Sequence, residues 1–177
     1  MKSEAGSNLI AMAVLTLIIG FLIVGGLFLM QNYNTIHSDQ SSISNSRDVE
    51  DALANFVALY GRYPCPAVMD ARLNTADFGV ENCSGVVSVV GRDSKNVLIG
   101  TVPVRTLNMP EEKIVDGYGK RYTYAITQDV TVPGVNVKTE YGAITIHNKD
   151  GDSISDIDGH VIYAVMSHNE EDRGAYD

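Results

Sequence analysis

The most prominent pattern in the chain is an apolar stretch at residues 9–30, LIAMAVLTLIIGFLIVGGLFLM, which contains no charged residue. An α-helix needs about 20 apolar residues to cross the hydrocarbon core of a bilayer, and this stretch is long enough. A helix that covers a globular core normally has a polar face, which this stretch lacks. The pattern therefore predicts a transmembrane helix at residues 7–30.

A cleaved secretory signal is the alternative. Such a signal has an apolar run of about 7–15 residues followed by a site of small residues. Here the run is longer and continues directly into Gln31 and Asn32, so we expect a retained anchor. Lys2 precedes the run and the next basic residue after it is Arg47, a distribution that favours a cytoplasmic N-terminus and a single pass.

Three glycines, Gly20, Gly25 and Gly26, interrupt the apolar stretch. Small residues let membrane helices approach closely, and glycine also lets a helix bend. Glycine is in addition simply common in membrane helices, so both interpretations stay open.

Residues 31–60 contain no proline or glycine and continue the helical pattern. Helical spacing is roughly followed by Ile43, Val49, Leu53, Phe56, Val57 and Tyr60. The match is strongest from Leu53 to Tyr60, which have the i, i+3, i+4, i+7 spacing of one helix face, and Gly61 then provides a stop signal. We expect one helix of roughly 50 residues whose second half packs one face on a domain. The alternative is a flexible joint at the serine-rich residues 38–46.

Residues 61–177 alternate short β-branched or aromatic runs with turn signals. Strands are predicted at 86–90 and, as strand or extended segment, at 96–104, with a helical turn at 110–115. Three further strands are predicted at 121–127, 143–147 and 160–166, the last of them central because it is apolar on both faces. Three antiparallel strands packed on the amphipathic helix give an α+β fold.

Charge and cysteine content narrow the range of possible functions. The formal net charge of -9 makes binding to a phosphate backbone unfavourable, so no nucleic-acid partner is expected. Cys65 and Cys83 are the two cysteines, and in a domain outside the cytoplasm they indicate one disulfide. Two unrelated buried thiols are the alternative.

No motif for catalysis is present, so we do not expect an enzyme. The four histidines, His37, His147, His160 and His168, lack metal-ligand spacing. The acidic segment 148–158, NKDGDSISDID, is either a calcium loop or a solvated hairpin turn, and it does not fit the register of a calcium-binding helix–loop–helix motif. No other cofactor is expected.

Several segments together resemble a known family. They are the short leader ending in Gly6, the segment LTLIIGFLIVGG at 15–26, GRYPCPA at 61–67, DGYGKRYTY at 116–124, and VMSHN at 165–169 with RGA at 173–175. Their order resembles type IV pilins and the pseudopilins of type II secretion systems, and the resemblance touches most of the chain.

The resemblance implies a leader at residues 1–6 that a prepilin peptidase removes between Gly6 and Ser7, followed by methylation of the new amino terminus. It implies residence in the bacterial inner membrane with the C-terminal domain in the periplasm, and then transfer into a pilus or pseudopilus filament. The implied partners are membrane lipid, other pilin-like subunits and an inner-membrane assembly platform.

One position departs from the family pattern. Most such subunits carry a glutamate where this chain has Ala11, and that glutamate pairs with the amino terminus of a neighbouring subunit. Its absence resembles certain minor subunits at a filament tip. The family also includes pseudopilins that bind calcium in a late loop, which here corresponds to residues 170–172. A membrane-anchored periplasmic binding domain that never polymerises is the rival function.

Overall fold

The computed structural model describes residues 4–136, 142–154 and 161–168. The chain divides into two compact units, Met1–Asp39 and Gln40–Asp177, which are described separately. The elements, in chain order, are α1 (Glu4–Tyr60), β1 (Val87–Val90), η1 (Arg92–Ser94), β2 (Asn96–Thr101), η2 (Glu111–Ile114), β3 (Thr123–Thr127), η3 (Gln128–Thr131) and β4 (Tyr163–Met166). The predicted α+β class is confirmed.

The predicted long helix is present as α1, and it continues through the serine-rich residues 38–46 where a joint was the alternative. It ends where the sequence predicts. Gly61 adopts a left-handed conformation with φ of 65°, and its N–H donates to the carbonyl oxygen of Val57 at 2.8 Å. Glycine adopts this conformation without steric cost, so it terminates the helix and turns the chain.

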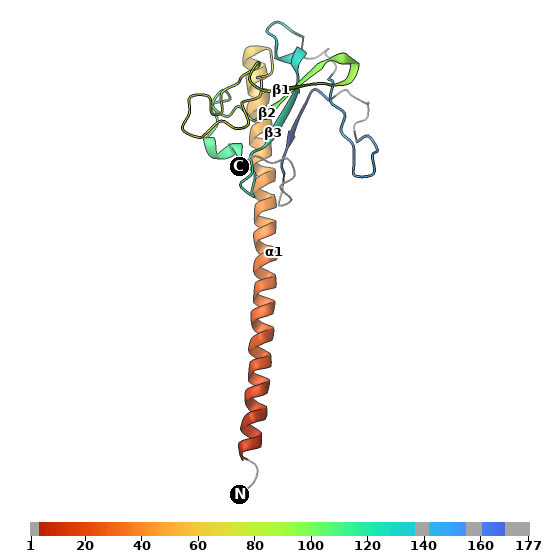
Figure 1. The fold of residues 1–177 in the computed structure, drawn as a ribbon. Helices are drawn as coiled ribbons and strands as arrows, with labels where there is room; N and C mark the ends of the chain where they lie inside the picture. The colour runs from red at the N-terminus through yellow and green to blue at the C-terminus, as the bar shows by residue number, and fades with distance from the viewer. Residues whose placement is uncertain (1–3, 137–141, 155–160, 169–177) are drawn as a thin grey trace. The chain divides into compact units, whose positions relative to one another are not determined.

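The second unit contains one antiparallel sheet with the strand order β1-β2-β3-β4 (Figure 1), and residues of β2 and β3 share a core with the C-terminal part of α1. The register pairs Leu98 with Ile126 between β2 and β3, and Ala125 with Ala164 between β3 and β4. β3 is one of the two inner strands of the sheet, and all five of its residues are buried.

Two expectations for the sheet are wrong. Residues 143–147 form no strand, and only isolated bridges join Ile144 to Val161 and His147 to Ser153. The reason is that the backbone of Ala143 is engaged elsewhere: its N–H donates to Thr127 Oγ1 at 2.9 Å, and its carbonyl accepts from Arg92.

The predicted central strand at 160–166 is also misplaced. It appears as the shorter β4 at one end of the strand order, and His160 lies outside the described residues. Its apolar character on both faces has a different cause, because the half-buried Tyr163 and Val165 pack on the core and a groove is lined by Ala164, Val165 and Met166.

The core lies between the helix and the sheet of the second unit. Val49 and Leu53 pack there with Tyr122, Tyr124 and Ile126, and all five are fully or almost fully buried. The buried face of α1 follows most of the predicted apolar spacing, but Ser42 is buried in place of Ile43, which is 52% exposed. The buried face runs through Ser42, Val49, Leu53 and Phe56, whereas Tyr60 is 61% exposed and stacks on Phe56 at 4.4 Å between ring centroids.

Candidate functional site

The first candidate surface is the apolar face of α1 within the first unit. Every described side chain from residue 12 to residue 30 is exposed, and Phe21 reaches 83%. Among the residues that the structure describes, this is the one stretch long and apolar enough to cross a membrane. The hydroxyl group of Thr16 in this stretch is hydrogen-bonded within the helix, because Thr16 Oγ1 donates to the carbonyl oxygen of Ala13 at 2.9 Å.

Gly20 opens a notch on this face. A hollow of about 370 Å³ is lined by Thr16, Leu17, Gly20, Phe21 and Val24, and a Cβ atom added at Gly20 would meet no atom within 4 Å. The space is therefore available to a side chain from outside the helix. The expected cleavage point, Gly6–Ser7, lies near the start of α1, and its processing stays a prediction.

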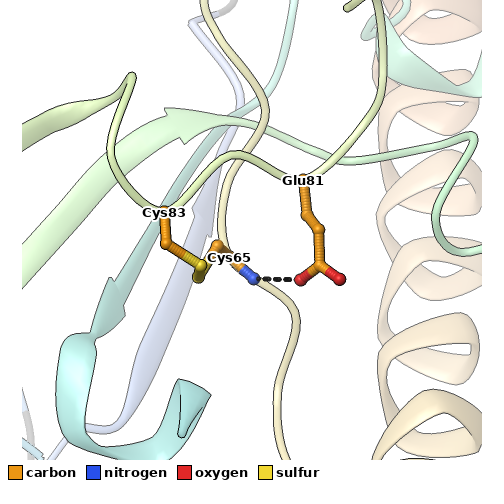
Figure 2. A group of neighbouring side chains, drawn as sticks. All are labelled: Cys65, Glu81 and Cys83. Atoms are coloured by element: carbon orange, nitrogen blue, oxygen red, sulfur yellow. Dashed lines mark hydrogen bonds between the residues drawn. A yellow bond between two sulfur atoms is a disulfide. The ribbon is translucent and has the colours of Figure 1, made fainter.

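The second candidate is the surface around the disulfide. Cys65 and Cys83 are bonded, with their Cα atoms 5.1 Å apart, which confirms the predicted disulfide (Figure 2). Cys65 is fully buried and Cys83 is exposed. The carboxylate of Glu81 lies within 4.8 Å of both sulfur atoms, which is a spacing that metal ligands show. The bond removes the thiolates that a metal would need, so the group is a structural clasp.

Glu81 joins this clasp to the end of α1. Its two carboxylate oxygens accept from Arg62 Nη1 at 2.9 Å and Nη2 at 2.7 Å, and Oε2 also accepts from the backbone N–H of Cys65 at 3.0 Å, which Figure 2 shows. The hydrogen bonds from Arg62 lower the pKa of Glu81, burial opposes this, and the Cys65 N–H adds to the lowering. The guanidinium also lies 5.2 Å from the centroid of the Phe56 ring.

Two further arginines hold the loop between the cysteines. Arg121 Nη1 donates to the carbonyl oxygens of Met69 at 2.6 Å and Ala71 at 2.9 Å. Arg105 donates to Leu73 at 3.1 Å and Thr75 at 2.9 Å. We call Arg105 and Arg121 the arginine clamp.

The clamp is anchored on its other side. Arg105 Nε donates to Glu111 Oε1 at 2.7 Å, and both guanidinium groups lie against the buried ring of Phe78, 5.3 and 5.4 Å from its centroid. Four alternate carbonyls of an otherwise irregular loop are thus fixed by two side chains. Sequence reasoning missed this, because the arginines are 30 to 52 residues away from their partners.

Beside the clamp lies a groove of about 470 Å³ between the last turns of α1 and residues 106–113. Its apolar lining includes Phe56, Leu59, Leu107 and Met109. Acidic residues of α1 form part of its rim. Asp48 pairs with Lys113 at 2.7 Å, whereas Asp51 is exposed.

The turn at residues 116–119 is organised by the buried carboxylate of Asp116. Asp116 Oδ1 accepts from the N–H groups of Tyr118 and Lys120, both at 2.9 Å. Its Oδ2 accepts from Ser167 Oγ at 2.6 Å and from the His168 N–H at 3.3 Å. The carboxylate therefore joins the turn to the segment after β4.

The same turn is fixed to α1 through Ser42. The N–H of Gly117 donates to Ser42 Oγ at 2.9 Å, and the hydroxyl of Tyr122 donates to the Ser42 carbonyl oxygen at 2.7 Å. Burial, with a contribution from the nearby Asp116 carboxylate, raises the pKa of Tyr122 to about 12.

The structure describes part of the proposed calcium segments. At residues 148–152 the side-chain oxygen of Asn148 accepts from the N–H groups of Asp150 and Asp152, both at 2.9 Å, which is the arrangement of a hydrogen-bonded turn. Residues 155–158 and 170–172 lie outside the described residues. Of the histidines, His147 contacts the Gly151 carbonyl oxygen and His168 contacts Thr123 Oγ1, while His37 packs beside Tyr33.

No protein-family model, curated protein or solved structure matches this chain. The features that indicate a function are therefore those of the chain's own residues. They present an apolar helix surface, a disulfide-closed loop and a groove with an acidic rim.

Proposed function

We propose that the chain is a structural subunit of the pilin-like or pseudopilin kind. In this proposal α1 holds the protein in the bacterial inner membrane, and residues 61–177 face the periplasm. The observation that carries the proposal is the exposed, uncharged face of α1 over residues 12–30. Transferring that much apolar surface from water into lipid or into contact with similar helices is strongly favourable.

Assembly would move α1 from lipid into the core of a filament. Lipid tails and aliphatic side chains are equally apolar, so burial alone gives the transfer no direction. Close packing must decide which helices associate, and the notch at Gly20 offers a position where a neighbouring helix fits closely. An inner-membrane assembly platform would supply the work, and a prepilin peptidase would first cut between Gly6 and Ser7.

The disulfide supports the orientation. The bond between Cys65 and Cys83 persists in an oxidising compartment, which the periplasm is and the cytoplasm is not. The charge distribution agrees with it, because Lys2 precedes the apolar stretch and the next basic residue is Arg47.

A second candidate is a single-pass anchored periplasmic domain that binds a partner and never polymerises. Ala11 favours it, because the glutamate that pairs neighbouring subunits in the resembling family is missing here. The groove beside α1 would then be the binding site.

N-terminal sequencing of the protein purified from its native membrane separates the two candidates. We expect a mature chain that starts at Ser7 with a methylated amino group. We also expect that deletion of the gene removes or shortens surface filaments or impairs secretion. An intact Met1, together with unchanged filaments and secretion, would favour the anchored binding domain. A soluble native protein that lacks residues 9–30 would contradict both.

A further inference from the structure

We propose that the loop tip Arg72-Leu73-Asn74 of one copy docks into the groove beside α1 of a second copy, with Leu73 entering the groove and Arg72 facing Asp51. This inference rests on the proposed function, because it supplies the contact by which the domains of neighbouring subunits recognise each other. The side chains of Arg72 and Leu73 take no part in the clasp or the clamp, which holds Leu73 through its backbone carbonyl oxygen only.

The tip is held by hydrogen bonds and carries an exposed apolar side chain. Leu73 is 56% exposed, although its carbonyl oxygen is held by Arg105 and that of Ala71 by Arg121. The tip also closes on itself, since the N–H and hydroxyl of Thr75 both donate to the Arg72 carbonyl oxygen, at 3.0 and 2.8 Å. Ordering such a loop before binding removes an entropic cost from the association.

The groove suits such an end. Its volume of about 470 Å³ is within the range of sites that accept small apolar groups. Leu59, on its lining, is 78% exposed, so apolar surface there stays in contact with water in the isolated chain. The residues of the tip do not line the groove of their own chain, so the place is open to another copy.

Charge complementarity favours the loop tip of a second copy as the group that occupies the groove. The protein carries a net charge of -9, so the long-range electrostatic interaction between two copies is repulsive. Arg72 is exposed and has no ion pair within the described part of the chain, and the same holds for Asp51 on the groove rim. The positive charge of Arg72 next to Leu73 is complementary to the negative charge of Asp51 next to the apolar groove. This complementarity fixes the orientation of one copy relative to the other.

Cysteine cross-linking between full-length copies in the membrane tests the contact. One strain would produce two single variants, Leu73→Cys and Leu59→Cys, so that a bond between the new cysteines must join different copies. We expect mild oxidation to give a disulfide-linked dimer. The matched control replaces Leu59→Cys by Val90→Cys, which is 73% exposed on β1. Equal dimer formation in both pairs would overturn the proposal.

Charge reversal gives an independent test of the same contact. Asp51→Arg in the Leu59→Cys copy should lower the dimer yield several-fold, and Arg72→Asp in the Leu73→Cys copy should restore it. Both positions are exposed, so the domain keeps its fold, which intact Cys65–Cys83 bonding would verify. Failure of the reversal to restore the dimer would contradict the proposed pairing.

A third variant separates this inference from the proposed function. Phe21→Cys on the apolar helix reports association of α1 without involving the tip. If Phe21→Cys dimerises while the tip and groove pair does not, the docking contact is wrong and the subunit assignment stands. If neither Phe21→Cys nor the tip and groove pair gives a cross-linked dimer, both the docking contact and the subunit assignment fail. A cross-link from Leu73→Cys to a different protein alone would also overturn the second copy as the occupant.

Discussion

Arg62 and Glu81 form a two-pronged ion pair in which Nη1 and Nη2 donate to different carboxylate oxygens at 2.9 and 2.7 Å. The pair bridges the first residue after the helix-terminating Gly61 and the loop that the disulfide closes. Planar bidentate pairing is specific to arginine, and lysine would lose one prong. Because neither side chain is more than a quarter exposed, solvent screens the interaction only partly.

Glu81→Gln should destabilise the domain by about 1–3 kcal/mol, which is typical of losing hydrogen bonds to a charged partner. The pKa of Glu81 is lowered in the folded state, so its contribution is present above the unfolded-state pKa near 4.5 and is lost as the pH falls through the lower folded value. Urea unfolding of the full chain in detergent at pH 7 and at pH 3 would measure this. The difference between variant and parent should shrink at pH 3, and an unchanged difference would refute the ionic contribution.

Reduction of the disulfide should lower the free energy of unfolding by roughly 3 kcal/mol, the chain-entropy value for a loop of this size. The measurement is urea unfolding with and without a reductant. The chain has two cysteines, both in this bond, so the variant with Cys65→Ala and Cys83→Ala provides a control that should not respond to reductant. A response of the double variant would show that the reductant acts elsewhere.

Tyr122→Phe should cost about 1 kcal/mol at pH 7, because it removes the hydrogen bond to the Ser42 carbonyl oxygen and leaves that oxygen without this donor. The pKa of Tyr122 is raised to about 12 in the folded state, so its stabilising effect is complete below pH 10 and is lost between pH 10 and about 12. The variant should therefore lose less stability over that interval than the parent does. Alkaline unfolding curves followed by circular dichroism would reveal the difference.

The helix and several strand positions could be predicted because their signals are local. An uncharged apolar run and the spacing of Leu53 and Phe56 are properties of neighbouring residues, and α1, β1 and β3 appear where those signals lie. The turn at 110–115 likewise follows from Pro110 and becomes η2. Such signals act within one turn of helix or one strand and do not depend on distant contacts.

What the sequence could not provide depends on contacts between distant residues. Residues 143–147 alternate apolar and polar residues as a strand does. However, the hydroxyl of Thr127 accepts a hydrogen bond from the N–H of Ala143, which a β-ladder would pair with a neighbouring strand. Ser42 has no apolar signal, yet it is buried because Tyr122 and Gly117 bind it across 75 to 80 residues. Its polar character gave no sign that it, rather than the apolar Ile43, lies on the buried helix face.

Gly20→Leu should weaken association between copies while leaving membrane insertion intact. The larger side chain fills the notch lined by Thr16, Leu17 and Phe21 and keeps neighbouring helices apart, but it makes the segment more apolar. Ile19→Leu is the matched control, since it changes neither size nor hydropathy substantially. Carbonate extraction reports insertion, and cross-linking through Leu27→Cys, an exposed position that does not line the notch, reports association. Equal association in both variants would exclude a role for the notch.

The arginine clamp should protect the loop between the two cysteines from proteolysis. Arg72 is a trypsin site in the exposed turn at the loop tip, and cleavage requires that turn to open locally. Arg121→Gln removes two hydrogen bonds to loop carbonyls without adding a trypsin site. The rate of cleavage follows the population of the open loop, and each 1.4 kcal/mol lost raises that population about ten-fold.

The disulfide makes this cleavage easy to identify. Arg72 lies between Cys65 and Cys83, so a chain cut there stays in one piece until the bond is reduced and then separates into two fragments. We expect Arg121→Gln to be cut after Arg72 at least ten-fold faster than the parent. Arg92→Gln, an exposed arginine outside the clamp, is the control and should be cut at the parental rate. Equal rates for all three proteins would mean that the clamp does not hold the loop closed.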